Sequence, residues 1–592
     1  MPFQLSPGVI TTEIDLTTVI PAVSTTNGGF VGDFNWGPAN TVITVDSEDR
    51  LASVFGRPDS NTAVHFLTAA SFLSYGNNLK VVRTSNSSSR NAYNQGTANA
   101  APAKIENQDQ WFAVHRATPT TTGGYGNTTL GIIGKYPGEW GNSLSIAYCP
   151  AANAGSNGFQ NWAYKSYFDG APGTSLYAQS RGGANDEIHV VVVDRFGYFS
   201  QGAQNYNFSN GTIATTQTVL EVFPFMSVAV DAKNADGTSL FYPDVLASSK
   251  YINWIAHPGN TTNWGTSASN GTSFSAVVGW NSGNTANASN LSGGSSALGT
   301  NADKIMAWDK FKNSDEVDVS LLVTADASPP VIQHVIDNVA EFRKDCVAFV
   351  SPASANVVNK PATEVTEISN YKSNIGRSSS YAAMDSGWKY MYDKYSGQYR
   401  YIPLNGDIAG LCVRTDTTRD PWFSPAGFNR GQIKNIVKLA FSPSKTFRDE
   451  LYKIGVNPVA TFTGEGTLLF GDKTMLSRPS AFDRINVRRL FIVLEKAIAT
   501  AAKYSLFEFN DEFTRSQFVS LVDPFLRDVQ GRRGIFDYRV ICDESNNTPE
   551  VIDRNEFVGD IYIKPARSIN FIQLNFVAVR TGVAFDEVVG RF

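Results

Sequence analysis

The sequence predicts a multidomain fold of the α/β and α+β classes, in which an α/β body built from both ends of the chain carries a β-rich insertion. Three observations predict it. Strand and helix patterns alternate on both sides of residues 84–302, the composition changes abruptly within that stretch, and a strand-like segment lies near each terminus. Because each terminal strand is set apart from the nearest globular block, we expect terminal strands to be exchanged between subunits.

Size and composition narrow the class of protein. The 592 residues suffice for about four domains by the usual length prior. The net charge of −5 and the 17% of charged residues argue against a general binder of nucleic acid or of anionic membranes. No segment has the pattern of a signal peptide or the length of a membrane span, so we expect no direct membrane insertion.

The four cysteines are far apart in the chain. Most of them lie inside apolar runs, which is typical of small buried side chains in a reducing compartment and not of a disulfide framework or a zinc site. These residues are Cys149, Cys346, Cys412 and Cys542.

The chain begins with an arm, residues 1–23, in which Ile10, Thr12, Ile14 and Leu16 alternate with polar residues. Next, residues 28–40 have the Gly and Pro turns of a strand pair. Residues 63–75 then have helical periodicity, and 79–83 form an apolar strand.

Residues 84–302 are rich in Gly, Ser, Thr and Asn and contain short β-like runs, so we interpret them as the insertion. Within it, 259–302 is close to a polar low-complexity tract. We expect the whole insertion, 84–302, to lie on the outside of any assembly and deletion of residues 259–300 to leave assembly largely intact.

The body resumes after residue 303. Residues 317–325, 330–343 and 345–352 predict a strand, a helix and a strand. A tyrosine-rich block, 381–401, is expected to pack within the body. Two amphipathic helices follow, with their apolar residues at helical spacing. The residues are Val487, Leu490, Phe491, Leu494, Ile498 and Ala501 in the first helix, and Phe518, Leu521, Val522 and Phe525 in the second.

The last part of the chain predicts three strands, at 535–542, 557–564 and 568–580. In the last of them Ile572, Leu574 and Phe576 line one face.

No pattern points to catalysis, to a cofactor or to a metal. Residues 466–474 have the glycine spacing of a phosphate loop, but Asp472 stands where the loop needs a lysine to neutralise phosphate charge. The five histidines have no acidic or cysteine neighbours at a repeated ligand spacing, and neither GxSxG nor HExxH occurs.

Several longer motifs resemble one family. They occur in a single collinear order and cover both body portions, about 1–83 and 303–592. The motifs are SPGV followed by an acidic strand (6–15), FNWGPA (34–39), FLSYGNNLKVVR (72–83), DIAGLCVRTD (407–416), PWFSPAGFNRGQI (421–433), PSAFDRINVRRLF (479–491), NNTPEVIDRNEFV (546–558) and KPARSINFIQLNFVAVRTGVAFDEVVG (564–590). Together they resemble the tail sheath protein of contractile-tailed bacteriophages of the T-even type.

This resemblance implies a structural protein of the virion tail, which is assembled in the host cytoplasm. It implies stacked six-fold rings around a tail tube, whose contraction drives the tube through the host envelope. The implied partners are the protein itself, the tail tube protein, and the baseplate and tail terminator proteins, with no nucleic acid.

The resemblance also implies a domain organisation. It implies an N-terminal arm (1–23) that joins the C-terminal domain, and a middle α/β domain from 24–83 and 303–443. It further implies an outer insertion at 84–302, whose residues 84–118 replace a reduced protruding domain, and a C-terminal inner domain at 444–592.

In that family the arms add strands to neighbouring subunits. The corresponding residues here are Val9, Ile10, Thr12, Ile14, Leu16, Ile572, Leu574, Phe576, Val583, Phe585 and Val588. Arg484, Arg488 and Glu495 share one helix face opposite the apolar stripe, and we hypothesise that the two arginines face the tube. The alternative is a simple solvated face. The alternative function is a surface or secreted β-rich carbohydrate-active protein, such as a polysaccharide hydrolase with 84–302 as its active part.

Overall fold

The computed structural model describes residues 24–94, 104–113, 130–155, 157–200, 217–280, 288–570 and 573. The chain divides into two compact units, which are described separately. The main unit comprises residues 21–421 and 425–499, and the C-terminal unit comprises 1–20, 422–424 and 500–592. The compact units thus divide after residue 499, whereas the sequence suggested a domain boundary near 443. The arm residues and nearly all of the strand expected at 568–580 lie outside the described residues.

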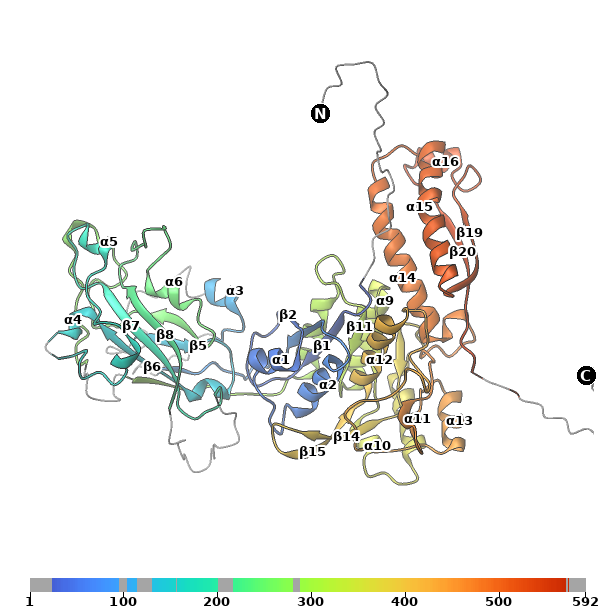
Figure 1. Ribbon diagram of the computed structural model, residues 1–592, viewed down its shortest axis with the longest axis horizontal. Helices are drawn as coiled ribbons and strands as arrows, with labels where there is room; N and C mark the ends of the chain where they lie inside the picture. The colour runs from blue at the N-terminus through green and yellow to red at the C-terminus, as the bar shows by residue number, and fades with distance from the viewer. Residues whose placement is uncertain are drawn as a thin grey trace, which may run out of the picture. The chain divides into compact units, whose positions relative to one another are not determined.

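A six-stranded sheet at the centre of the main unit joins the chain on the two sides of the insertion (Figure 1). Its spatial order is β13-β12-β11-β1-β3-β2. The strands are β1 (Gly28–Gly32), β2 (Val42–Val45), β3 (Leu79–Arg83), β11 (Leu321–Val323), β12 (Val347–Val350) and β13 (Ala382–Met384). β1 pairs in parallel with β3 on one side and with β11 on the other, while β2 is the one antiparallel neighbour in this sheet. This confirms the predicted α/β body drawn from both sides of residues 84–302. The expected strand pair at 28–40 is wrong, because that stretch supplies β1 alone among the strands.

Helices cover both faces of this sheet. They are α1 (Glu48–Phe55), α2 (Ala63–Leu73), α7 (Asn301–Trp308), α8 (Pro329–His334), a π-helical segment (Val335–Ala340), α9 (Glu341–Arg343), α10 (Ser354–Val357), α11 (Glu364–Ile375), α12 (Asn405–Thr418) and α13 (Lys445–Lys453). Strand residues alternate between two hydrophobic clusters: Leu321 and Val323 enter the cluster with α2 and α12, whereas Leu322 enters the cluster with α8. A sheet buried on both faces explains why these strands are almost wholly apolar.

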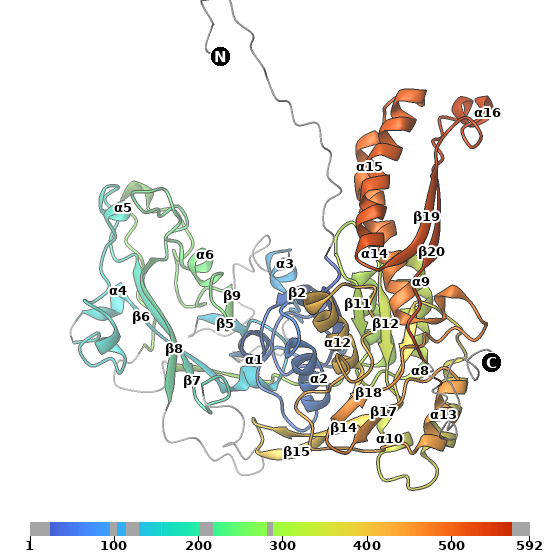
Figure 2. The same ribbon diagram turned by 45° about the vertical axis from the view of Figure 1, so that its right-hand side comes forward.

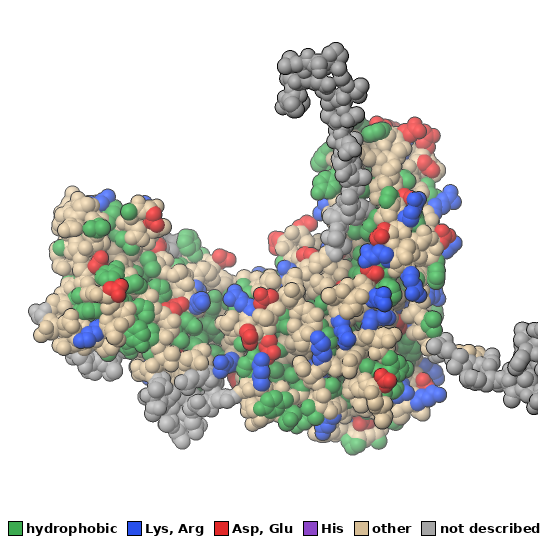
Figure 3. All heavy atoms as spheres, viewed as in Figure 1, with side chains coloured by type: hydrophobic (Ala, Val, Ile, Leu, Met, Phe, Trp, Pro, Cys, Tyr) green, Lys and Arg blue, Asp and Glu red, His purple; other side chains and the backbone are tan. Residues whose placement is uncertain are grey.

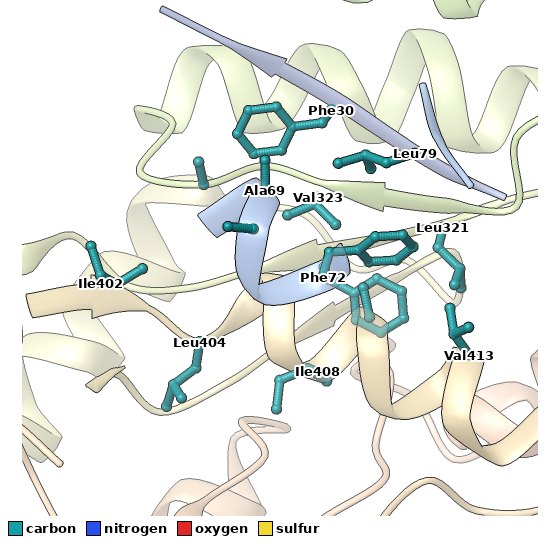
Figure 4. Packing of buried hydrophobic residues seen from close by; sticks show 14 of the residues in the cluster. Phe30, Ala69, Phe72, Leu79, Leu321, Val323, Ile402, Leu404, Ile408 and Val413 are labelled. Carbon is teal, nitrogen blue, oxygen red and sulfur yellow. The ribbon is translucent and has the colours of Figure 1, made fainter. Parts of the chain in front are cut away.

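Figure 4 shows the first of these clusters, where Phe72 of α2 and Ile408 and Val413 of α12 meet the strand residues Leu79 and Leu321. Glycine at position 28 is required here. A Cβ at Gly28 would lie 2.6 Å from the ring of Phe72, so the strand and helix α2 approach closely only without a side chain.

The body outside the insertion contains two further, smaller sheets (Figure 2). One consists of β14 (Trp388–Asp393), β15 (Gln398–Pro403) and β16 (Lys438–Leu439), and the other of β17 (Val459–Phe462) and β18 (Gly466–Leu469). Packing of the tyrosine-rich block is only partly as expected, since Tyr392 and Tyr399 are half exposed. Asp472, which stands at the lysine position of the phosphate-loop pattern, is buried.

The insertion forms a seven-stranded sheet in the order β8-β7-β6-β10-β4-β5-β9. Its strands are β4 (Tyr93–Asn94), β5 (Gly131–Gly134), β6 (Leu144–Pro150), β7 (Glu187–Asp194), β8 (Thr218–Ser227), β9 (Ile252–Ala256) and β10 (Ala288–Ser292). Its short helices are α3 (Gln108–Trp111), α4 (Ala151–Ala154), α5 (Leu176–Gln179) and α6 (Tyr242–Leu246).

The expectation that residues 259–300 can be removed without harm conflicts with the structure. β10, from this tract, lies in the middle of the sheet and pairs with β6 and β4. Trp264, Phe274 and Val277 are buried in the core of the insertion. A deletion of 259–300 would therefore remove a central strand and part of the core.

The described part of 84–118 belongs to the same sheet. Trp111 is buried, and its Nε1 donates a hydrogen bond to the carbonyl of Trp254 at 2.7 Å. Arg90 bridges to Ser295 at the other end of the insertion. These contacts connect the first part of the insertion to its last part.

Arg83, the last residue of β3, connects body and insertion. Its buried guanidinium donates to the carbonyls of Phe34 at 2.9 Å and Gly37 at 2.7 Å in the body, and to that of Pro137 at 2.7 Å in the insertion. Three backbone acceptors satisfy the rigid donor fork of the arginine, which fixes the chain where it leaves the body.

The C-terminal unit contains the end of α14 (Ile485–Ala502), the long helix α15 (Glu512–Gly531), the strands β19 (Ile535–Ile541) and β20 (Asp560–Pro565), and the short helix α16 (Pro549–Asp553). Asp511 caps α15, since its side chain accepts a hydrogen bond from the Thr514 amide at 2.8 Å. The predicted helices at these two places are confirmed. On α15, the buried apolar residues are Phe518, Val522, Leu526 and Val529.

The role of the polar tract can be tested at two nearby positions. Phe274 is 2% exposed and Val278 is 68% exposed. We expect Phe274→Ala to lower the free energy of unfolding by about 3–5 kcal/mol, because it leaves a cavity in the core of the insertion. Val278→Ala should change it by less than about 0.5 kcal/mol. Denaturant unfolding of both variants measures the difference, and equal, small effects would contradict the structural role of this tract.

Candidate assembly site in the C-terminal unit

The sheet of the C-terminal unit has two strands in the described part of the chain. β19 and β20 pair antiparallel from Ile541 opposite Asp560 to Ile535 opposite Pro565, with a bulge near Ile535. Each strand therefore has one edge whose backbone amides and carbonyls face no strand among the described residues. Such an edge is the template that an added strand needs.

Helix α15 covers one face of this pair. Tyr538 of β19 donates from its hydroxyl to a carboxylate oxygen of Asp523 at 3.0 Å. The rings of Phe518 and Phe557 lie 5.5 Å apart, and a Cβ at Gly559 would lie 2.8 Å from the Phe518 ring. The helix and the strands are thus in close contact along the unit.

The face is nevertheless incompletely covered. Val540, Ile561 and Ile563 are only partly buried, although β-strand alternation places them on the same side as Tyr538. On the other side Tyr562 is half exposed. An isolated two-stranded sheet is marginally stable in water, so this one depends on further packing or further strands.

Asn547 organises the loop between the two strands. It is buried, its amide nitrogen donates to the carbonyl of Val558 at 2.7 Å, and its side-chain oxygen accepts from the Val558 amide at 2.9 Å. Asn510, before α15, donates to the same oxygen at 3.1 Å. This role was missed from the sequence, where only the turn-forming pair Asn546-Asn547 before Thr548-Pro549 marks the place.

The two arginines expected on an exposed helix face both have partners within the main unit. Arg484 lies 3.1 Å from a carboxylate oxygen of the buried Asp472 and also donates to the hydroxyl of Tyr452. Burial alone would lower the pKa of Arg484, but Tyr452 and Asp472 raise it above its ordinary value. The aspartate that stands in the phosphate-loop pattern is therefore an ion-pair partner.

Arg488 is 6% exposed. Its guanidinium lies 4.2 Å from the ring centroid of Tyr381 and 4.0 Å from that of Phe482, and it donates to the Ser380 hydroxyl at 2.9 Å. The prediction of an exposed face is wrong for Arg488, because partners from a segment up to 108 residues away cover it. Arg484 keeps 18% of its side chain exposed. Contact of either arginine with a tube stays a prediction.

Motifs that carried the family resemblance meet in the main unit. Arg489 of α14 and Asp416 of α12 form a buried ion pair at 2.5 Å, and Thr25 donates to the same carboxylate at 2.6 Å. Lys389 and Asp407 form a second buried pair at 2.9 Å, to which Tyr75 donates a hydrogen bond. These charges join distant segments of the fold.

The described residues contain no group of three or more His, Cys, Asp or Glu side chains that could hold a metal ion. All four cysteines are free and buried. In the same part of the chain, no helix is both long enough and apolar enough to cross a bilayer.

Three family models match the chain in order. They are the Gp18 domain III N-terminal region of the tail sheath protein at residues 29–84, the phage tail sheath protein central domain at 299–475, and the phage tail sheath C-terminal domain at 477–578. The stretch between the first two matches is the insertion.

Curated relatives match over the whole length. The tail sheath protein of Vibrio phage KVP40 is 34% identical, and the alignment covers 99% of this chain and 100% of that protein. The tail sheath protein of Enterobacteria phage T4 is also 34% identical, with 99% of both chains covered. Among solved structures, the fold is similar to that of a sheath tail protein from Listeria innocua, with a TM-score of 0.51, 12% identity, and coverage of 92% of this chain and 96% of that one.

Because this identity extends over the entire chain, it excludes the alternative of a carbohydrate-active protein. The chain belongs to the contractile tail sheath proteins of phages, a non-enzymatic structural family of the virion tail.

Proposed function

We propose that this chain polymerises as stacked six-fold rings around a tail tube, and that contraction of the polymer drives the tube through the host cell envelope. Family membership supports this proposal. Its partners would be other copies of the chain, the tail tube protein, and the baseplate and tail terminator proteins, and it would assemble in the host cytoplasm. The insertion would lie on the outer side of the polymer. We also propose the domains implied by the family resemblance: the arm 1–23, a middle domain from 24–83 and 303–443, the insertion 84–302, and an inner domain 444–592.

The observation that carries the assembly mechanism is the two-stranded sheet, whose outer edges face no strand in the part of the chain that the structure describes. The N-terminal arm (1–23) and the C-terminal residues of neighbouring copies would add strands to β19 and β20. Each backbone hydrogen bond adds on the order of 1 kcal/mol net. A strand of about five residues with an apolar face is therefore a strong tether, and its backbone pairing can persist while subunits rotate.

Removal of residues 582–592 tests the strand exchange. We expect a folded monomer that forms no tubes, because only the donated segment is lost. Circular dichroism measures the fold, sedimentation velocity the mass, and electron microscopy the tubes. Tube formation by the truncated chain would contradict the donation of this segment.

A matched pair of full-length variants tests whether the apolar side chains of the arm, and not only its presence, are needed for assembly. Replacement of Val583, Phe585 and Val588 by serine should weaken assembly, because the added strand loses its apolar side chains. Replacement of Thr581, Asp586 and Glu587 by serine should leave assembly close to that of the wild type. If the second variant assembled less well than the first, these apolar side chains would not hold the arm on the neighbouring sheet.

Arg488 gives a prediction that separates folding from tube binding. Arg488→Glu places a carboxylate among Tyr381, Phe482 and Ser380 in a buried position. We expect it to lower the free energy of unfolding by about 3–5 kcal/mol without any tube present. Arg478→Glu, at an exposed position of the same segment, is the control and should cost less than about 0.5 kcal/mol. Full stability of Arg488→Glu, combined with loss of tube binding, would instead support a tube contact.

A further inference from the structure

The segment that connects α14 to α15 in the C-terminal unit presents a dense group of exposed apolar side chains. Five large residues within ten positions are between 64% and 105% exposed. They are Tyr504, Leu506, Phe507, Phe509 and Phe513. Scattered exposed apolar residues are ordinary, but a contiguous group of this kind marks a binding surface.

Phe507 adds a sign of strain. Its φ of 70° lies in the left-handed region, which side chains with a Cβ rarely adopt, and its ring is fully exposed. Strained backbone of this kind gathers at functional sites, because a binding partner can compensate for it.

Acidic side chains surround this aromatic group. Asn510 donates to the carbonyl of Glu556 at 2.8 Å and to Asn547, so the connecting segment lies against the loop that carries α16. The exposed carboxylates at this end are Glu508, Asp511, Glu512, Asp543, Glu544, Glu550 and Asp553. Figure 3 shows acidic side chains gathered where Figure 1 places α16. Of the basic residues nearby, Arg554 is paired with Glu556 and Arg515 is buried. Lys503 and Arg539 are exposed, so the seven carboxylates outnumber the basic side chains that face solvent. We call this region the acidic end.

The opposite end of the same unit is basic. Ala566 donates to the carbonyl of Gly534 at 3.1 Å, which brings the residues after β20 beside the end of α15. Arg527, Arg532 and Lys564 here each pair with an aspartate of the same end, at Asp523, Asp528 and Asp537. Arg533 and Arg567 make no salt bridge among the described residues, so they set the sign of this basic end. Phe536 beside them is 70% exposed.

The two ends act independently within one chain. Helix α15 connects them, and its 20 residues span about 30 Å. This exceeds the Debye length of about 8 Å at physiological ionic strength, so the ends barely neutralise each other. The preference of a helix for acids at its start and bases at its end explains Glu512 and Arg532, but not Glu544, Glu550 or Arg567, which lie outside α15.

We propose that the acidic end of one C-terminal unit binds the basic end of the C-terminal unit of a second copy, with the aromatic group of residues 504–513 packed against the region of Phe536. The chain carries both halves of this contact, complementary in charge and each with exposed aromatic surface. A contact between two different surfaces of identical chains repeats from copy to copy, as an extended polymer requires. The inference rests on the proposed self-assembly and adds the surfaces through which it occurs.

Charge reversal at either end tests the proposal in the full-length chain. Arg533→Glu with Arg567→Glu makes both ends acidic, and Glu544→Lys with Glu550→Lys reverses the other end. We expect each double variant to raise the protein concentration needed for tube-free assembly at low salt by about tenfold, through loss of attraction and gain of repulsion. Lys360→Glu with Lys445→Glu, which makes the same change in net charge as the first pair on exposed positions of the main unit, should assemble like the wild type.

A quadruple variant that combines both charge-reversing pairs distinguishes a specific contact from a general effect of net charge. With both ends reversed, the ends are complementary again, so assembly should return towards the wild-type concentration. The proposal is overturned if the double variants assemble normally, or if the quadruple variant is no better than either. Loss of binding to the tail tube alone, with tube-free assembly unchanged, would assign this surface to the tube protein and also overturn it. Arm truncations leave both ends intact, so failure of the strand exchange is distinguishable.

A second variant covers the aromatic group. Phe507→Gly removes the exposed ring and suits the positive φ, so its unfolding temperature should equal or exceed that of the wild type. The concentration needed for assembly should nevertheless rise. Unchanged assembly of this variant would exclude Phe507 from the contact.

Discussion

The parallel pairing of β1 with both β3 and β11 is the constraint on which the rest of the main unit depends. It joins residue 28 to residue 79 on one side and to residue 321 on the other, so the insertion must leave and re-enter the body at one sheet. Closing such a long loop costs only slightly more entropy than closing a short one. The body can therefore carry a large insertion, provided that the exit point is fixed. The guanidinium of Arg83 fixes it with three backbone carbonyls.

Buried charge has a related role elsewhere in the main unit. The ion pairs Arg489–Asp416 and Lys389–Asp407 connect segments that are adjacent in space and distant in sequence. Removing one partner of such a pair leaves an uncompensated charge in the interior, which is far more costly than the pair is stabilising. Arg489, Asp416 and Asp407 stand inside the motifs by which the family can be recognised, although they perform no chemistry. The motifs of this chain mark junctions of the fold.

Secondary structure was predicted best where the spacing of apolar side chains within one segment specifies a strand or a helix. The strand β3 and the helix α2 were predicted nearly to the residue, because alternation and helical spacing of apolar residues are local signals. Prediction failed at β10, whose segment Ala288–Ser292 is polar and is a strand only because β6 and β4 lie on either side. It failed again at Arg488, whose partners Tyr381 and Ser380 are about a hundred residues away in the chain. The edges of β19 and β20 that face no strand among the described residues were equally invisible, since pairing along an edge is a property of the sheet and not of any residue.

The difference between the two ends of the C-terminal unit has a consequence for whatever terminates a polymer of this chain. If unlike surfaces meet at every junction, the outermost copies expose different chemistry: aromatic and acidic at one extremity, basic at the other. Two capping proteins would then need opposite charge, and neither could occupy the place of the other. The polarity of the whole filament would follow from a few side chains about one helix length apart.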